Sequence, residues 1–391
     1  LSALYGMRSQ NADQKMKTAE KKKHKKYLAV IAALWAFIVL MNLLAWFAKG
    51  VSDWYIDHIT MIWVNTYSRL TSLAGFSVGE IMIVIGAVLV LALAVLAIVR
   101  IFVRRKNSFK KFFRRYFRTV FAVATAVCVI MTLNCSMLYH ASAIDPAPER
   151  ESRRYTVEEL KLLRNYIVEK CNEYSILFDR DESGGIIYDG DLQLKAKEAM
   201  WNISDKYPRL SGFYPDVKPL KSSVLMSQID ICGYYFPFSL EANYNTYMYI
   251  LNYPHTYCHE LSHLHGYIYE DEANFLSYLA CTETDDDFFV YSGYISVLGY
   301  VYNAYWKYID DWDAYALLPQ TNELVDADNI FLTDEAWEEV NRLKIFDTKT
   351  VSTVNRTLSD ASMKLGGVSD GFASYSRVVG LLLQYYDGIL Y

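Results

Sequence analysis

The stretch PHTYCHELSHLHG, from Pro254 to Gly266, is the most informative part of the chain. His259 and His263 are four residues apart, so on a helix their rings lie on one face and can hold a single Zn²⁺. Pro254 and Gly266 stand where a helix is expected to begin and to end. Glu260 adjoins the first histidine, where a carboxylate can act as a general base. The stretch therefore predicts a helix that carries a zinc site.

A third zinc ligand is expected soon afterwards, because a catalytic zinc takes three protein ligands and keeps a fourth position open. The segment EDEANF at 270–275 offers Glu270 and Glu272. Glu270 begins an E-x-x-A-N pattern that resembles the E-x-x-A-D pattern of gluzincin peptidases, in which the glutamate binds zinc. The resemblance implies that Glu270 is the third ligand and that Asn274 hydrogen-bonds a ligand histidine. Glu272 is the alternative ligand, but Leu276, one turn later, has no side chain that could support a histidine.

Other side chains near the motif are expected to have structural roles. His255 and His265 lie off the ligand face of the helix. Cys258 adjoins the first ligand, but its side chain points about 100° away on a helix, which favours a small buried residue. Tyr291 and Tyr294 are candidates for stabilising an oxyanion. With 33 tyrosines in the chain, each is nevertheless expected in the core.

Three uninterrupted apolar runs precede residue 140, at 27–47, about 78–103 and about 120–138. Each is long enough to cross a hydrocarbon core of about 30 Å as a helix. The first run is too long for a signal peptide. No ionisable residue lies near the centre of any run, which argues against a transporter or a proton pathway. The sequence therefore predicts three transmembrane helices.

Charge is distributed unevenly and indicates the orientation of these helices. Residues 1–118 hold 19 Lys and Arg against 5 Asp and Glu. Because the whole chain has 39 Lys and Arg and 44 Asp and Glu, the remainder holds 20 basic and 39 acidic residues. The basic clusters lie at 21–26 and 104–118, whereas the loop at 49–75 has only Lys49 and Arg69. The excess of basic residues on cytoplasmic loops places the N-terminus inside and everything after about residue 140 outside. Such clusters rest on anionic lipid, so no nucleic-acid partner is expected.

The region 141–391 is long enough for one sizeable core, and its pattern predicts an α+β, mainly helical domain. A capping box at Thr156–Glu159 predicts a helix to about Cys171. A loop rich in Pro, Gly and Ser is expected at 207–221. The remaining expected elements are a helix at 192–205, short strands at 224–231 and 244–251, and mostly helix from about 288, closing with 375–386.

Four further segments, together with the zinc motif, resemble a family of uncharacterised bacterial membrane proteins. They are FSVGE at 76–80, FPFSLEANYN at 236–245, YSGY at 291–294 and GFASYSR at 371–377. That family joins N-terminal transmembrane helices to a zincin-like domain with an HExxH…ExEANF signature. The resemblance covers about residues 27–390 and implies a multi-pass protein of the bacterial cell membrane. The segment 236–245 is expected to form either an edge strand that holds a peptide or a structural turn and strand.

These observations predict a basic cytoplasmic N-terminus (1–26), a three-helix membrane region (27–140) and an extracytoplasmic zincin-like domain (141–391). The function expected is hydrolysis of a peptide or protein substrate by zinc-activated water, with Glu260 as base. The alternatives are a non-catalytic zinc-binding sensor or scaffold of the envelope and, less favoured, a transport component. Glu260 favours the enzyme, because a purely structural zinc has four closed ligands. The sequence specifies neither the oligomeric state nor the pairing of the outer cysteines, which are Cys171, Cys232, Cys258 and Cys281.

Overall fold

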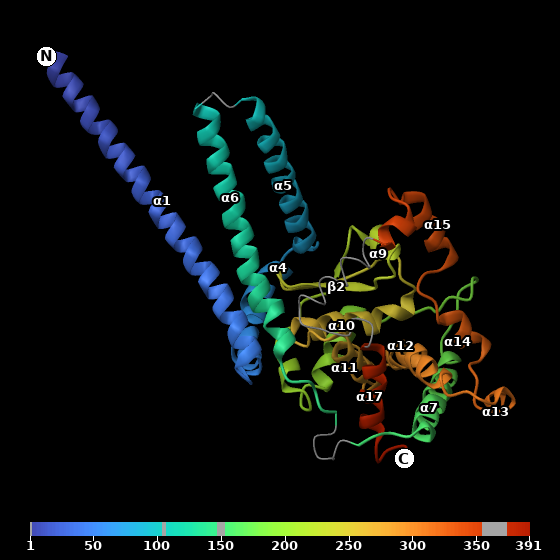
Figure 1. Cartoon of the computed structure of the whole chain (residues 1–391). Coiled ribbons are helices and arrows are strands. Elements are labelled where there is room, and N and C mark those ends of the chain that lie inside the picture. The colour runs from blue at the N-terminus through green and yellow to red at the C-terminus, as the bar shows by residue number, and fades with distance from the viewer. Residues whose placement is uncertain (1, 104–106, 147–152, 354–373) are drawn as a thin grey trace. The chain divides into compact units, whose positions relative to one another are not determined.

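The computed structural model describes residues 2–103, 107–146, 153–353 and 374–391 (Figure 1). The chain forms two compact units. The first unit contains the residues through Lys49 and Val84–Met137, and the second contains Gly50–Ile83 and Leu138–Tyr391. The loop that follows the first apolar run therefore folds with the C-terminal region.

Three helices are long and apolar enough to cross a membrane, as the sequence predicted. They are α1 (Ser2–Phe47), α5 (Val78–Phe102) and α6 (Asn107–Met131), the last extended by η3 (Thr132–Ser136) and η4 (Leu138–His140). The candidate spans within them are Thr18–Phe47, Val78–Phe102 and Asn107–His140. A helix satisfies its own backbone hydrogen bonds, so these apolar runs can lie in lipid without unpaired polar groups.

Polar side chains join α1 to the last span inside the first unit. Asn42 donates to Thr132 Oγ1 at 3.4 Å and accepts from Ser136 Oγ at 2.6 Å. The Tyr27 hydroxyl donates to the Arg118 carbonyl at 3.1 Å. Hydrogen bonds of this kind hold transmembrane helices together, since neither partner has water available in lipid.

The chain from Val51 to Ser72 is helical throughout and belongs to the second unit. Its consecutive parts are α2 (Val51–Tyr55), η1 (Ile56–Thr60), α3 (Met61–Trp63), η2 (Val64–Ser68) and α4 (Arg69–Ser72). Every fourth side chain is buried: Ser52, Ile56, Thr60, Val64 and Ser68. A repeat of four is wider than the 3.6 residues of an α-helical turn, and the two π-helical turns, η1 and η2, accommodate it.

Helices form most of the second unit (Figure 1). The predicted capping box is confirmed: Thr156 Oγ1 accepts from the Glu159 backbone, and the Glu159 side chain accepts from the Thr156 backbone. The predicted helices at 192–205 and 375–386 are confirmed, the first ending three residues early. The larger helices are α7 (Val157–Ser175), α8 (Leu192–Asn202), α10 (Tyr253–Leu264), α11 (Glu270–Thr282), α12 (Asp287–Trp306) and α17 (Ser374–Tyr386). The shorter ones are α9 (Ser223–Ser227), α13 (Trp312–Ala316), α14 (Glu323–Asp328), α15 (Asp334–Leu343), η5 (Pro208–Leu210) and η6 (Ile250–Asn252).

A small mixed sheet contacts the helix α10. Its strands are β1 (Lys218–Pro219), β2 (Gly233–Phe236) and β3 (Glu241–Tyr244), in the order β1-β3-β2. β3 pairs parallel to β1 and antiparallel to β2. The segment 236–245 thus supplies the end of β2, a turn and the middle strand. This matches the structural alternative, because β3 is the middle strand and the segment supplies only Phe236 of the edge strand β2.

Both predicted strands, at 224–231 and 244–251, are wrong. The first stretch forms α9 and a turn, because the Glu80 carboxylate accepts the backbone N–H groups of Lys221 and Ser222 at 2.9 Å each and fixes the chain just before α9. The second stretch ends its strand at Tyr244, because the Asn245 side chain accepts the Tyr247 N–H and turns the chain. Side-chain contacts of these kinds override strand propensity.

A buried ion pair joins the sheet to the first turn of α5 within the second unit. Glu241 accepts from the backbone N–H groups of Val78 at 3.1 Å and Gly79 at 2.7 Å. Lys218 Nζ lies 2.5 Å from Glu241 Oε1 and donates to the Thr71 carbonyl as well. Both charged side chains are at most 6% exposed. Every charge is therefore hydrogen-bonded, as burial requires.

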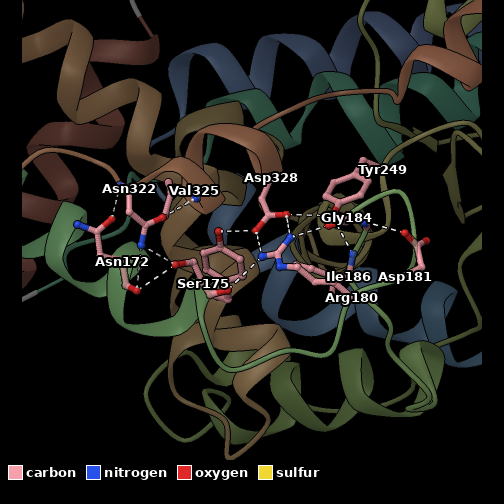
Figure 2. A network of polar contacts seen from close by, with 12 residues as sticks. Asn172, Ser175, Arg180, Asp181, Gly184, Ile186, Tyr249, Asn322, Val325 and Asp328 are labelled. Atoms are coloured by element: carbon pink, nitrogen blue, oxygen red, sulfur yellow. Dashed lines mark hydrogen bonds and ion pairs between the residues drawn. The ribbon is translucent and has the colours of Figure 1, made fainter.

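A second buried carboxylate ties α14 to the rest of the helical unit (Figure 2). Asp328 accepts two hydrogen bonds from the Arg180 guanidinium, at 2.8 and 2.7 Å. It also accepts from the hydroxyls of Tyr249 at 3.0 Å and Tyr291 at 2.9 Å. A bidentate guanidinium–carboxylate pair fixes both position and angle, so this network orders the end of α14 against α12.

Removing the Glu241 charge should destabilise the second unit. Glu241→Gln leaves the buried Lys218 without its counterion, and we expect a loss of about 3 kcal/mol in the free energy of unfolding. The measurement is thermal and denaturant unfolding of the full-length protein in detergent. The control is Glu339→Gln, which breaks an ion pair to the exposed Arg342 and should change stability by less than about 0.5 kcal/mol. Equal effects of the two variants would contradict the structural role given to Glu241.

Candidate metal centre

Two helices joined by a tight turn bring the motif residues together. α10 has Pro254 in its first turn, where a missing N–H leaves no unmet hydrogen bond. Gly266 follows with φ 95°, a left-handed conformation that favours glycine. A Cβ at Gly266 would lie 2.8 Å from Ile56 Cγ2, so the turn also needs glycine for space. α11 then begins at Glu270. The helix predicted at the motif and its glycine stop are confirmed.

His259, His263 and Glu270 form a group that could hold a metal ion, with one potential ligand atom from each residue within 4.8 Å of the others. Glu270 Oε2 lies 3.2 Å from His259 Nε2, and Glu270 Oε1 lies 3.6 Å from His263 Nε2. Ligand atoms bound tetrahedrally to zinc at about 2.0–2.1 Å stand roughly 3.3 Å apart. The nitrogen and oxygen donors and their spacing therefore fit zinc.

Hydrogen bonding orients one of the two imidazoles. His263 Nδ1 lies 2.7 Å from the Tyr267 carbonyl oxygen. Since a carbonyl can only accept, Nδ1 carries a hydrogen and donates it, which leaves Nε2 as the nitrogen that faces the group. A ring held in this way is the usual arrangement of a metal-ligating histidine. His259 Nδ1 is buried without a hydrogen-bond partner in the described part of the chain.

Glu260 is buried beside this group and the sheet. Its Oε2 atom has no hydrogen-bond partner among the described residues. β2 passes directly over the carboxylate, since a Cβ at Gly233 would lie 2.6 Å from Glu260 Oε1. Burial raises the pKa of Glu260 to about 7, although His259 and His263 act to lower it. A carboxylate with such a pKa can both take up and release a proton near neutral pH.

Glu270 and His263 each shift the pKa of the other toward its charged form. Desolvation of its carboxylate against the two rings would raise the pKa of Glu270, but His263 and His259 hold it well below its usual value. Burial alone would lower the pKa of His263, but Glu270 raises it to about 9. Without metal, the group is therefore a carboxylate bound to a protonated histidine, and a metal ion must displace that proton.

The two acidic candidates of α11 point to different places. Glu270 belongs to the group and is 60% exposed. Glu272 is buried and accepts the Ile144 N–H at 2.9 Å, so it lies away from the histidines. Asn274 lies one turn after Glu270, but no hydrogen bond between its side chain and either ligand ring occurs among the described residues. Its supporting role stays a prediction.

The other residues singled out in the sequence lie outside the group. His265 has its ring nitrogens 2.8 and 3.2 Å from the carbonyls of Arg209 and Phe213, and burial lowers its pKa to about 4. Tyr294 lies in the core and contacts the Tyr166 hydroxyl, while Tyr291 belongs to the Asp328 network. His255 is hydrogen-bonded to the Asn274 backbone. All six cysteines are free, and Cys258 Sγ lies 4.0 Å from Cys281 Sγ.

Sequence reasoning missed two backbone elements of the site. One is the Tyr267 carbonyl that orients His263, and the other is Gly233, which lets β2 approach Glu260. A carbonyl gives no signal in a sequence. Gly233 follows Cys232 and precedes a run of aromatic residues, and a glycine at the start of a strand is itself a sign of close backbone approach.

The structure thus defines a class: a membrane protein, mainly helical, in which a helix pair presents a His-His-Glu group that could hold a metal ion. Comparison with protein families adds the group of sequences to which it belongs. Residues 55–383 match the family described as "Protein of unknown function (DUF3810)". The match covers most of the chain, so the protein belongs to the DUF3810 family. No curated protein and no solved structure matches it.

The two acidic candidates can be separated by metal content. We expect Glu270→Gln to lower zinc affinity by at least about tenfold, because it removes the anionic oxygen of the group. Glu272→Gln should leave zinc affinity unchanged. Burial raises the pKa of Glu272 to about 7, so its side chain is already partly neutral near pH 7, and glutamine can still accept the Ile144 N–H. Zinc binding by full-length protein in detergent, measured by chelator competition, checks both. The reverse result would assign the metal to Glu272.

Zinc affinity should increase with pH. The raised pKa of His263 means that its proton competes with the metal below about pH 9. Between pH 6 and 8, we expect affinity to rise by close to tenfold per pH unit, with about one proton released per zinc. Calorimetry in buffers of different ionisation enthalpy measures this proton release. An affinity independent of pH would contradict the charge state assigned to the group.

Proposed function

We propose that the protein is a membrane-anchored zinc-dependent metallopeptidase that hydrolyses peptide bonds outside the cytoplasm. The observation that carries the proposal is the combination of a His-His-Glu group with a buried, unpartnered glutamate beside it. A purely structural zinc site has four protein ligands and no use for such a carboxylate. The group offers three ligands, which leaves a position for water or substrate.

The chemistry divides between the metal and the chain. When bound, zinc supplies Lewis-acid chemistry: it makes water nucleophilic near neutral pH and polarises a carbonyl. His259 Nε2, His263 Nε2 and Glu270 would hold it. Glu260 takes the proton of the attacking water at its carboxylate and later donates it to the leaving amine nitrogen. The carboxylate must be charged for the first step and protonated for the second.

The location of the reaction follows from the charge pattern of the loops. Basic clusters flank the first span on its N-terminal side and separate the second from the third, which assigns both flanks to the cytoplasm. Three spans then put residues from about 141 onward outside. The second unit also includes Gly50–Ile83, so the outer part of the enzyme comprises the first outer loop as well as the C-terminal region.

The decisive experiment uses the full-length protein in detergent, loaded with zinc, and an unfolded protein as substrate. We expect the natural protein to cleave it, and Glu260→Gln to retain zinc but lose at least about 100-fold in cleavage rate, because the general base is gone. Glu272→Gln is the matched control, a buried glutamate on the neighbouring helix whose substitution should preserve the rate.

Each outcome of this experiment has a distinct meaning. Zinc in both proteins with cleavage by neither would favour a non-catalytic sensor or scaffold. Equal cleavage by the natural protein and Glu260→Gln would remove Glu260 from the mechanism. Absence of zinc binding by the natural protein would overturn the metal site itself.

A further inference from the structure

The helical stretch Val51–Ser72 has an exposed apolar face opposite its buried one. The buried row repeats every four residues from Ser52. The exposed row two residues out of step with it alternates large apolar with polar side chains: Trp54, His58, Ile62, Thr66 and Leu70. Large apolar side chains on the exposed side and just beyond the helix are 41% to 82% exposed: Trp54, Ile62, Trp63, Leu70, Leu73 and Phe76. Large apolar side chains exposed along one side of a helix mark a contact with another apolar phase.

The chain on either side shows what this phase is. The first candidate span ends at Phe47, four residues before the stretch begins, and the second starts at Val78, six residues after it ends. Both ends of the stretch are therefore tied to helices that leave the hydrocarbon core. An amphipathic helix tethered in this way lies along the membrane interface. Tryptophan is the residue most favoured at that depth.

We propose that residues 51–76 lie in the interface of the outer leaflet, with this apolar face in lipid, and seat the metal centre on the membrane surface. The lipid bilayer is the occupant of the face. The opposite, buried face then belongs to the metal-binding unit, so a single helix separates the candidate site from lipid.

Contacts join the stretch to the turn beside the metal group and to Arg209. Ile56 packs against Gly266, the turn between α10 and α11, and Gly266 lies three residues after His263. The Arg209 guanidinium bonds Asp53 at 2.9 Å and Asp57 at 2.6 Å. Since a helix with its side chains is about 10–12 Å across, about one helix diameter separates the turn at Gly266 from the exposed face.

This placement restricts the substrates, an inference that rests on the proposed peptidase function. A site so close to lipid reaches polypeptide segments that emerge from the outer leaflet, such as the chain next to a membrane anchor. Membrane anchoring also raises the effective concentration of such segments near the site. The substrate class is therefore the membrane-proximal segment of an anchored protein or peptide.

The lipid contact is tested without reference to activity. A photo-crosslinking amino acid is placed at Ile62, Leu70 or Leu73 in the full-length protein, reconstituted in phosphatidylethanolamine–phosphatidylglycerol vesicles. We expect lipid adducts by mass spectrometry at all three positions. Ile176 and Ile345, exposed apolar residues elsewhere in the second unit, are the matched controls and should give at least tenfold fewer adducts. Adducts no more frequent than at the controls would overturn the proposal.

The substrate class is tested with one peptide sequence in three forms: soluble, or joined to a lipid anchor by a linker of about 5 or about 40 residues. The vesicle-bound, zinc-loaded protein should cleave the short-linker form at least tenfold faster than the soluble one. The triple variant Ile62→Ser, Leu70→Ser, Leu73→Ser should lose this preference while cleaving the soluble form as before. Leu194→Ser is its control.

The crosslinking and cleavage experiments distinguish the interfacial helix from the peptidase function. Lipid adducts with no cleavage of any form would leave the interfacial helix standing and overturn the peptidase. Cleavage of the three forms at equal rates would preserve the peptidase and overturn the membrane-proximal substrate class.

Discussion

The second unit depends on one buried carboxylate, that of Glu241. Two N–H groups in the first turn of α5 donate to it, and the positive end of a helix favours a negative charge there. Lys218 neutralises what remains of the charge. Since Glu241 opens β3, the same side chain sets where the sheet lies, and the β2 strand paired to β3 carries Gly233 over the Glu260 carboxylate. The position of the proposed general base is thus linked to the start of a membrane helix.

This link joins two of the segments that carry the family resemblance in the sequence. FSVGE at 76–80 and FPFSLEANYN at 236–245 meet in the structure: Gly79 donates to Glu241, and a Cβ at Gly79 would lie 2.3 Å from the Phe236 ring. A glycine is required by that contact. Residues 371–373 of the segment at 371–377 lie outside the described residues.

The sequence predicted those parts of the site that depend on local geometry. The His259–His263 spacing, the capping box at Thr156 and the stop at Gly266 all depend on the geometry of one helix and its ends, so a short window of sequence contains them. The failures depend on distant partners. The turn before α9 follows from Glu80, more than 140 residues away. The strand β3 ends at Tyr244, just before Asn245, whose side chain bonds Ser227 as well as the Tyr247 N–H. The different roles of Glu270 and Glu272 likewise depend on a distant partner, because the Ile144 N–H donates to Glu272.

The unequal burial of the acidic residues supports a site built for exchange. Glu260 is 4% exposed, whereas the ligand candidate Glu270 is 60% exposed. A structural zinc site is closed by four protein ligands, whereas a catalytic one keeps a position open. Here the proposed base is buried with a raised pKa, whereas Glu270, on α11, is exposed to solvent. The proposed hydrolysis would use such an asymmetry, since a proton acceptor must be desolvated, while a metal ion must remain reachable by water and by substrate.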